Sequence, residues 1–283
     1  LARGAVIKPR ARVREITLGA DGLVDGVVYN DSSGVLHKQK ARIVVMACNG
    51  IGTPRLLLNS KSAQFPDGLG NSNGLMGKNL MFHPYAMVTG VFDDDLEGYK
   101  GPIGCSIISQ QFYETDLSRG FVRGYAFQVN RSGGPVHTAL GGIGRHTIPW
   151  GDDHRRIFNN RFGRTITIAV IGEDLPEPHN RVTLDHEKVD GDGIPAPKVT
   201  YRMSDNSLKM MGHGMGKATE VLEIAGAKEV MVNQLLRPSG WHLMGTARMG
   251  DHIENSVVDC WGRCHGVKNL FIIDGSIFVT AGA

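Results

Sequence analysis

The chain ends with SGWHLMGTARMGDHIENSVVDCWGRCHGVKNLFIIDGSIFVTAGA, residues 239–283, and this stretch decides the fold that we expect. It opens with Trp241-His242 and a loop of small residues, Met244–Gly250. It closes with an apolar run, Leu270–Ile273, that is followed at once by Asp274-Gly275. A buried strand that stops at Asp-Gly places a carboxylate and a flexible backbone at the carboxyl end of a sheet, where ligands bind in open α/β folds. The stretch therefore predicts a ligand site in an α/β lobe.

The same stretch resembles the C-terminal signature of the glucose–methanol–choline (GMC) family of FAD-dependent oxidoreductases. In that family a His before a Gly-Thr loop faces the flavin, and a strand that ends in Asp-Gly-Ser lies along the cofactor. The string HLMGTARMG is most similar to the flavoprotein subunits of gluconate and sugar dehydrogenases. The resemblance implies that FAD is the cofactor, that His242 is the catalytic base, and that Trp241, Asp274 and Gly275 bind the cofactor.

A second stretch near the start of the chain points to the same lobe. Residues 11–47 have the pattern of a β-meander followed by a strand, Ile43–Ala47, that is apolar throughout, as in strands covered on both faces. Glycines follow, and we expect a helix with Thr53 as its N-cap and Pro54 at its first position, whose N-terminus can stabilise a phosphate. The string GTPRLLLNS is similar to the second GMC signature. That likeness implies that Val13 and the Asn49-Gly50 loop bind the cofactor.

The expected fold class is α/β, or α+β overall. It consists of a partial FAD-binding lobe of GMC type and a substrate lobe built on an antiparallel sheet with helices. We assign residues 1–60 to the partial FAD-binding lobe, residues 61–235 to the substrate-binding lobe, and residues 236–283 to a return into the FAD-binding lobe with the catalytic His segment. Ile43–Ala47 and Leu270–Ile273 should then share one sheet. Because the first lobe is partial, we also expect exposed apolar surface around Val44, Leu56 and Ile272.

The middle of the chain gives fewer expectations. Gly77–Pro84 resembles the GMC segment that crosses between the two lobes, and we expect its His83 to be structural. Strands are predicted over residues 85–92 and 165–171. A helix should start after Ser204, and six of its side chains are expected to share one buried face: Leu208, Met211, Met215, Ala218, Leu222 and Ala225.

Composition excludes several classes of protein. A content of 41% hydrophobic and 21% charged residues is typical of a globular chain, and a net charge of +3 with interspersed signs predicts no nucleic-acid partner. No apolar run reaches about 18 residues, so we expect no membrane span. Cys260 and Cys264 are separated by three residues instead of the two of a haem attachment motif, and the histidines lack metal-site spacing, so no metal is predicted. Because the chain opens with Leu1 instead of Met, we expect residues before it, and the compartment stays open between periplasm and cytoplasm.

Oxidation of an alcohol needs a base for the hydroxyl proton and an acceptor for the hydride, and no protein side chain accepts hydride. The resemblance thus implies an FAD-dependent dehydrogenase or oxidase of CH–OH groups in sugars, sugar acids or other alcohols, with a small-molecule substrate and an electron-acceptor subunit as partners. The family's second catalytic residue would fall beyond Ala283 and its ADP-binding fingerprint before Leu1, so we expect the fragment to be inactive alone. Two alternatives stay open, a lyase of the hydroxynitrile type and a non-catalytic binding fragment. The sequence contains no Gly-x-Ser-x-Gly elbow of a serine hydrolase.

Overall fold

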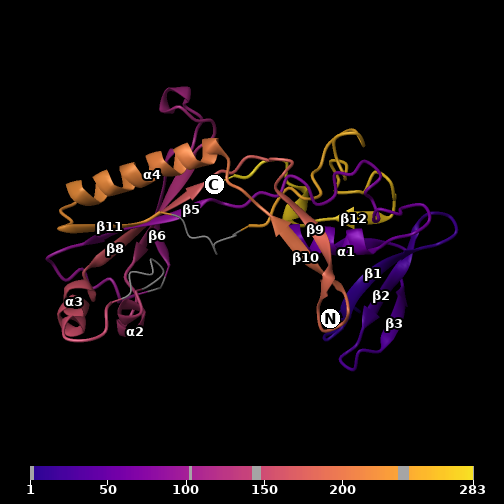
Figure 1. Ribbon diagram of the computed structural model, residues 1–283, viewed down its shortest axis with the longest axis horizontal. Coiled ribbons are helices and arrows are strands. Elements are labelled where there is room, and N and C mark those ends of the chain that lie inside the picture. The colour runs from indigo at the N-terminus through magenta and orange to yellow at the C-terminus, as the bar shows by residue number, and fades with distance from the viewer. Residues whose placement is uncertain (1–2, 102–103, 142–147, 235–241, 283) are drawn as a thin grey trace. The chain divides into compact units, whose positions relative to one another are not determined.

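The computed structural model describes residues 3–101, 104–141, 148–234 and 242–282. The chain divides into two compact units (Figure 1). Unit 1 comprises Leu1–Phe82, Leu175–Arg202 and His242–Ala281, and unit 2 comprises His83–Asp174, Met203–Trp241 and Gly282–Ala283. Both units mix helices with strands, and the larger sheets are antiparallel, so the expected α/β class is confirmed.

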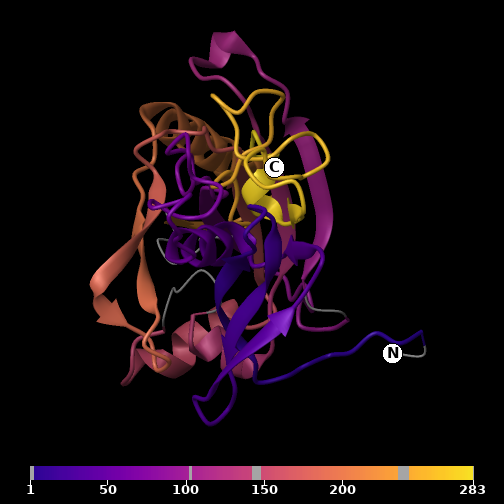
Figure 2. The same ribbon diagram turned by 90° about the vertical axis from the view of Figure 1, so that its right-hand side faces the viewer.

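In unit 1 the described residues form three small sheets and one α-helix. Its elements are β1 (Arg12–Leu18), β2 (Val24–Asn30), β3 (Leu36–Lys40), β4 (Val44–Met46), α1 (Asn49–Asn59), β9 (Arg181–Val189), β10 (Pro195–Thr200), β12 (Leu270–Ile272) and the 3-10 turn η2 (Gly275–Ile277). Strands β1, β2 and β3 form the expected meander, and β9 and β10 form a hairpin (Figure 2). Strands β4 and β12 form a two-stranded parallel sheet.

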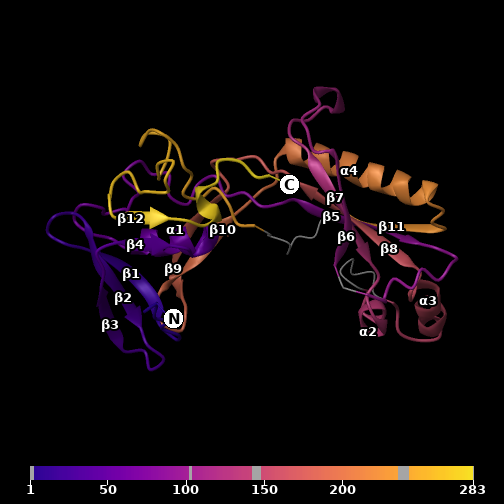
Figure 3. The same cartoon turned by 180° about the vertical axis from the view of Figure 1, so that it is seen from behind.

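The pairing of β4 with β12 joins the two apolar runs that the sequence singled out (Figure 3). Val44 pairs with Leu270 and Met46 with Ile272, and the N–H of Ile273 donates to the carbonyl of Met46 at 2.9 Å. Parallel strands need a long connection between them, and β4 and β12 are separated by more than 200 residues of sequence. The prediction that these runs share a sheet is confirmed.

One face of this strand pair is exposed, as expected of a partial lobe, although the exposed residues differ from those predicted. Met46, Leu270 and Ile272 face the core of unit 1, whereas Ile43, Val45 and Ile273 are 58%, 52% and 61% exposed. Alternate residues of a strand point to opposite faces, so one face of the pair is packed and the other is open. The exposed apolar residues are therefore Ile43, Val45 and Ile273 instead of Val44, Leu56 and Ile272; Ile272 is fully buried.

The two compact units do not comprise the same residues as the lobes that we predicted from the sequence. Residues 61–82 and 175–202, which we assigned to the substrate lobe, belong to unit 1. The first segment packs on α1 and the Gly-Thr loop, since Leu69 N donates to Leu57 O at 2.9 Å and Gly77 N to Thr246 O at 2.7 Å. Backbone bonds from the second segment, such as Val182 N to Gly77 O at 2.8 Å, bind it to the first. The boundary between Phe82 and His83 lies in the segment that was expected to cross between lobes.

Unit 2 is a five-stranded antiparallel sheet with a long helix on one face (Figure 1). Its elements are β5 (Tyr85–Val91), β6 (Cys105–Phe112), η1 (Leu117–Arg119), β7 (Tyr125–Arg131), α2 (Pro135–Ala139), α3 (Asp153–Arg161), β8 (Thr165–Gly172), α4 (Asp205–Ile224) and β11 (Glu229–Asn233). The strand order is β11-β5-β8-β7-β6, and the predicted strands over residues 85–92 and 165–171 are the adjacent β5 and β8. His83 is buried beside them, with Nδ1 3.2 Å from the carbonyl of Gly172, as expected of a structural histidine.

Helix α4 begins where the sequence predicted, but the residues on its buried face differ in part from those predicted. Ser204 is the N-cap, and its hydroxyl accepts from the N–H of Ser207 at 3.1 Å. The buried residues are Ser207, Met210, Met211, Gly214, Ala218 and Leu222. Leu208 and Ala225 were expected on this face but are exposed. Leu208 points away from the row of buried residues, and Ala225 is the C-cap, beyond the last helical residue Ile224. None of the described helices is long and apolar enough to cross a membrane.

Candidate functional site

The predicted catalytic base, His242, opens the last segment of unit 1. Its imidazole is exposed and its backbone has φ of +51°. The residues after it run beside the turn that follows β12: Gly245 N donates to Gly275 O at 3.2 Å, and Ala247 N donates to Ser276 O at 2.8 Å. His242 therefore leads directly into a loop that is bonded to the Asp-Gly-Ser turn. Trp241, the neighbouring residue of the prediction, lies outside the described residues.

Two glycines bring three segments to one carbonyl group. A Cβ built on Gly50 would lie 2.5 Å from the carbonyl oxygen of Leu243, and one built on Gly275 would lie 2.7 Å from the same oxygen. Both distances are shorter than any real contact of a Cβ, so only glycine permits this approach. Leu243 directly follows His242 in the sequence. The three stretches that the sequence predicts to bind cofactor or substrate thus meet within unit 1.

The carboxylate of Asp274 accepts hydrogen bonds from residues at the start of α1. Its Oδ2 accepts from Cys48 N at 2.8 Å, from Asn49 N at 3.1 Å and from the hydroxyl of Thr53 at 2.6 Å. Its Oδ1 accepts from Ser276 N at 2.9 Å. The carboxylate therefore stabilises the N-terminus of a helix through charge-assisted hydrogen bonds from a strand end more than 200 residues away.

The helix begins at Asn49, not after Thr53, so the predicted N-cap is wrong. Asn49 Oδ1 accepts from Ile51 N at 2.9 Å and from Gly52 N at 3.1 Å. Together with the bonds to Asp274, this occupies most of the N–H groups that a helix N-terminus offers to an anion. A phosphate could bind these N–H groups only by displacing the side chains of Asn49 and Asp274.

Pro54 explains how the Gly-Thr loop is attached to α1. Proline has no N–H, so Pro54 leaves the carbonyl of Gly50, four residues earlier, without its helical donor. The hydroxyl of Thr246 donates to this carbonyl at 2.8 Å, and Thr246 is fully buried. Because a buried polar group is costly when unpaired, this bond fixes the loop against the helix. No sequence pattern indicated this pair, whose members lie 196 positions apart.

Val13 lies with Cys48 at a cavity of about 380 Å³ in unit 1, lined by Ala11, Arg12, Val13, Cys48, Gly52, Arg55, Leu56 and Ile194. This volume is in the range of small-molecule sites. Two arginines border it, and both pair with Asp190 in the turn of the β9–β10 hairpin: Arg55 Nη2 at 2.8 Å and Arg12 Nη2 at 3.2 Å. Burial opposes ionisation of Asp190, but the Ile194 N–H and the Arg55 guanidinium outweigh it and hold the pKa of Asp190 below its ordinary value.

The residues of unit 1 fit part of a nucleotide-type cofactor. The cavity at Val13 combines apolar walls with two guanidinium groups, and Gly50 and Gly275 leave room for close approach. Ser276 carries a buried hydroxyl without a hydrogen-bond partner, directly after Asp274-Gly275. Such a group needs an explanation, and a bound ligand is one. Within the described residues, no group of three or more His, Cys, Asp or Glu side chains is arranged to hold a metal.

Part of the chain matches the model of a known protein family. Residues 176–283 match the profile of the GMC oxidoreductase C-terminal region, which contains His242, Thr246 and Asp274. This part of the chain is similar to the GMC oxidoreductases. The middle and N-terminal parts of the chain are also similar to members of the family, because the matches to whole proteins extend over nearly all of the chain.

Two curated GMC relatives and one solved structure illustrate the likeness. The chain is 43% identical to 2-methyl-1,2-propanediol dehydrogenase of Mycolicibacterium austroafricanum over 100% of its own length and 52% of that protein. It is 28% identical to the fructose dehydrogenase large subunit of Gluconobacter japonicus, over 99% of the chain and 50% of that protein. The crystal structure of pyridoxine 4-oxidase from Mesorbium loti superposes with a TM-score of 0.60 at 14% identity, over 96% of this chain and 53% of that chain, which shows a shared fold. The chain thus spans about half the length of the relatives that it matches.

Proposed function

We propose that the complete protein is an FAD-dependent oxidoreductase of CH–OH groups in small alcohols, polyols or sugars. The observation that carries this proposal is the meeting of Gly50, Gly275 and Leu243 at one point, next to His242. The GMC relatives named above are a diol dehydrogenase and a sugar dehydrogenase subunit, which supports the same substrate class. The relatives are about twice as long, so the activity belongs to the complete protein and we expect none from the 283-residue chain alone.

The chain's own residues would hold part of the FAD. We assign the contacts to Val13 and to the two glycine turns, Asn49-Gly50 and Asp274-Gly275. Asp274 contributes mainly by ordering the start of α1, because its carboxylate already accepts four hydrogen bonds from the chain, together from Cys48, Asn49, Thr53 and Ser276. Trp241 is assigned beside His242 on sequence grounds.

His242 is the general base in this proposal. A neutral imidazole nitrogen accepts the proton of the substrate hydroxyl, so that the oxygen can form a carbonyl as the adjacent carbon loses hydrogen. A bound FAD would supply the acceptor for the hydride that leaves this carbon. The histidine then passes its proton to solvent, for which its exposed position is suited. Thr246 and the bonds from Gly245 and Ala247 keep the following loop, and with it the histidine, in a fixed position.

The direct test is to purify the complete protein and follow flavin absorbance while alcohols are added. The proposal predicts bound FAD and loss of its oxidised absorbance with diols, other small alcohols or sugars. Cleavage of a cyanohydrin without any change in flavin absorbance would instead establish the lyase alternative. Absence of flavin together with absence of turnover would leave the non-catalytic alternative and contradict the proposal.

An electron-acceptor subunit is a second part of the proposal. The name of the fructose dehydrogenase relative identifies a large subunit, so that protein functions in an assembly. We propose that the complete form of this protein likewise delivers electrons to a partner protein. Co-purification from the native cell, compared with oxygen consumption by the isolated protein, tests this: rapid turnover with oxygen alone would argue for an oxidase without such a partner.

A further inference from the structure

Unit 1 has another cavity, of about 310 Å³, beside the C-terminal end of α1. All of its lining residues belong to unit 1. Three cationic side chains border it: Lys61 just after α1, Lys78, and Arg181 on β9. Asp67 is the one carboxylate among the described lining residues, and no ion pair joins it to the three cations. The lining therefore carries more positive than negative charge.

The backbone places two of these cations side by side. Lys78 and Arg181 lie directly opposite each other in an antiparallel bridge. Next to them, Val182 N donates to Gly77 O at 2.8 Å, and a Cβ built on Gly77 would lie only 2.2 Å from Val182 O. Glycine at position 77 thus permits this close approach. Directly opposite residues have Cβ atoms about 4.5–5.5 Å apart, and like charges there are destabilising.

No described acidic side chain offsets this repulsion. Lys61, Lys78 and Arg181 form no ion pair and no side-chain hydrogen bond with the residues that the structure describes. Lys78 is half-buried, so solvent screens its repulsion with Arg181 only in part. An anion bound between the two side chains would replace one repulsion by two attractions. The arrangement therefore points to an anionic ligand.

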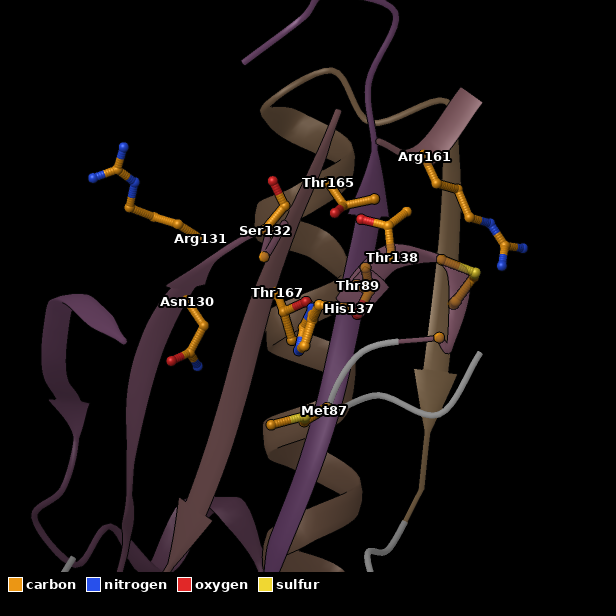
Figure 4. A pocket seen from close by; sticks show the side chains of 13 residues that line it. Met87, Thr89, Asn130, Arg131, Ser132, His137, Thr138, Arg161, Thr165 and Thr167 are labelled. Atoms are coloured by element: carbon orange, nitrogen blue, oxygen red, sulfur yellow. Dashed lines mark hydrogen bonds between the residues drawn. The ribbon is translucent and has the colours of Figure 1, made fainter. Parts of the chain in front are cut away.

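The cations at the cavity on the sheet of unit 2 provide a contrast (Figure 4). Arg131 donates to the carbonyl of Lys100, and Nη2 of Arg161 lies 3.7 Å from Glu229 Oε1. Figure 4 shows both guanidinium groups directed away from Thr167. Those charges interact with other groups of the chain, whereas the charges at the cavity of unit 1 are available to a ligand.

The groups around the cavity of unit 1 suit a phosphate in particular. A guanidinium group can donate to two phosphate oxygens at once, and an ammonium group adds a compact charge with three donors. Thr183 and His186 on β9 contribute a hydroxyl and an imidazole to the lining. A phosphate monoester has three strong acceptor oxygens and a charge of about −1.5 to −2 at neutral pH. It can therefore use several of these donors together.

We propose that this cavity binds a phosphate group, as the free ion or as the monoester of a small metabolite. Small-molecule sites have volumes of roughly 300–1,000 Å³, so the cavity has room for a small organic group beside the phosphate. Leu58, which lines the cavity, lies eight residues after Gly50 in α1, or about 12 Å along the helix axis. The phosphate site is therefore distinct from the turns of unit 1 that we assigned to the flavin.

The test is calorimetric titration of the complete protein with inorganic phosphate, in an amine buffer at constant ionic strength. Lys78→Met and Arg181→Gln remove the charge but keep most of the side chain, and we expect each to weaken phosphate binding about tenfold or more. Lys268→Met changes an exposed lysine of unit 1 outside the cavity, and this matched control should bind phosphate as the wild type does. Equal affinity of the wild type, Lys78→Met and Arg181→Gln would overturn the proposal.

Ethyl phosphate identifies the source of the phosphate group, because it has an ester but no alcohol that the enzyme could oxidise. Tighter binding than that of inorganic phosphate assigns the site to a phosphomonoester. Equal or weaker binding assigns it to the free ion.

Melting temperatures control for folding. Without phosphate, Lys78→Met should melt no lower than the wild type, since it removes one of two like charges. Phosphate should raise the melting temperature of the wild type and not that of Lys78→Met. An equal rise with sodium chloride of the same ionic strength would show screening of charges instead of binding, and would also overturn the proposal.

Flavin content separates this site from the cofactor. Lys78→Met should retain as much flavin as the wild type. Loss of flavin together with loss of phosphate binding would assign these cations to the phosphates of FAD and contradict a separate site. A complete protein without flavin would refute the proposed function, whereas phosphate binding that is lost in Lys78→Met would still support this site.

Discussion

The bond between Thr246 and Gly50 shows how one missing N–H determines a partner far along the chain. Pro54 removes the helical donor to Gly50 O, and the Thr246 hydroxyl replaces it. Thr246→Val should therefore destabilise the protein by about 1–3 kcal/mol, because it leaves a buried carbonyl unpaired. Chemical denaturation measures this, with Thr246→Ser as the variant that keeps the donor.

A double-mutant cycle makes this prediction specific. Pro54→Ala supplies an N–H to Gly50 O, so Thr246→Val should cost less in that background than in the wild type. Equal costs in the two backgrounds would mean that the hydroxyl is not the replacement donor.

Some site residues could be predicted from the sequence and others could not. Asp274-Gly275 and Asn49-Gly50 are recognisable because both follow apolar strands, and the structure brings them together through the carboxylate of Asp274. Val13 lies at the cavity that also includes Cys48. Thr246 and the Arg55–Asp190 pair were not recognisable, since a threonine in a small-residue loop and an arginine in a helix have many equally ordinary partners. Whether Val13 and the glycine turns bind FAD stays a prediction.

Helix α4 contains three glycines that differ only in what they face. A Cβ on Gly214 would lie 2.5 Å from Val170 Cγ1, whereas a Cβ on Gly212 or Gly216 would have nothing within 4 Å. Gly214→Ala should therefore destabilise the protein by about 1–3 kcal/mol through overpacking. Gly212→Ala and Gly216→Ala should each stabilise it by about 0.5–1 kcal/mol, because alanine is the better helix former. Chemical denaturation of the three variants measures these changes in the free energy of unfolding. A change of the same sign in all three variants would contradict the packing of α4.

His213 on α4 links the stability of unit 2 to pH. Its Nδ1 lies 2.8 Å from the hydroxyl of Tyr125, and the rings of Phe112 and Phe121 pack against it edge to face. Burial lowers the pKa of His213 from 6.5, Arg119 and Lys217 lower it further, and Asp116 opposes them. The neutral form is therefore the one that the fold favours.

The sign of the pH effect follows from this direction. The unfolded chain binds the proton more readily, so the contribution of His213 to stability is present above about pH 6.5 and is lost as the pH falls through the folded-state pKa. His213→Gln cannot titrate, and it should reduce the fall in unfolding free energy between neutral and mildly acidic pH. An unchanged pH dependence in this variant would contradict the assignment.

Element boundaries show where sequence patterns suffice. The N-cap of α4 is local, since Ser204 binds Ser207 three residues later, and the pattern predicted it. The start of α1 is not local: Asp274, which binds Cys48 and Asn49, is contributed by the other end of the chain. The pattern Thr53-Pro54 has the chemistry of a helix start, but in the structure tertiary contacts extend the helix five residues upstream, to Asn49.

For the chain as a whole, the exposed face of the β4–β12 pair is the surface from which we expect self-association. Ile43, Val45 and Ile273 are each more than half exposed on one face of a two-stranded sheet. Exposed apolar strands favour self-association. The 283-residue chain produced alone should therefore associate, and Val45→Lys should reduce light scattering without lowering the melting temperature. Val199→Lys on β10, 43% exposed in the wild type, is the matched control and should have no such effect. A wild-type chain that stays monomeric at high concentration would contradict this prediction.

The division into units shows the limit of sequence patterns. Apolar runs identified which ends of the chain share a sheet, but residues 61–82 and 175–202 lack such runs over most of their length and join unit 1 through backbone bonds and the Arg55–Asp190 pair. The backbone bonds that join the β9–β10 hairpin and residues 61–82 to the rest of unit 1 are isolated, so they have no periodicity that a sequence could reveal. The assignment of unit 1 to the flavin and of unit 2 to the substrate accordingly stays a prediction.

The proposed function depends above all on His242 taking the hydroxyl proton during alcohol oxidation. This role is tested by the rate of flavin bleaching by alcohol in the complete protein, normalised to bound flavin, for the wild type, His242→Ala and His252→Ala. His252 is an exposed histidine ten residues further on and is the matched control. We predict a rate at least about 100-fold lower in His242→Ala, with flavin content unchanged, and a normal rate in His252→Ala. A rate per flavin in His242→Ala close to that of the wild type would show that His242 is not the base.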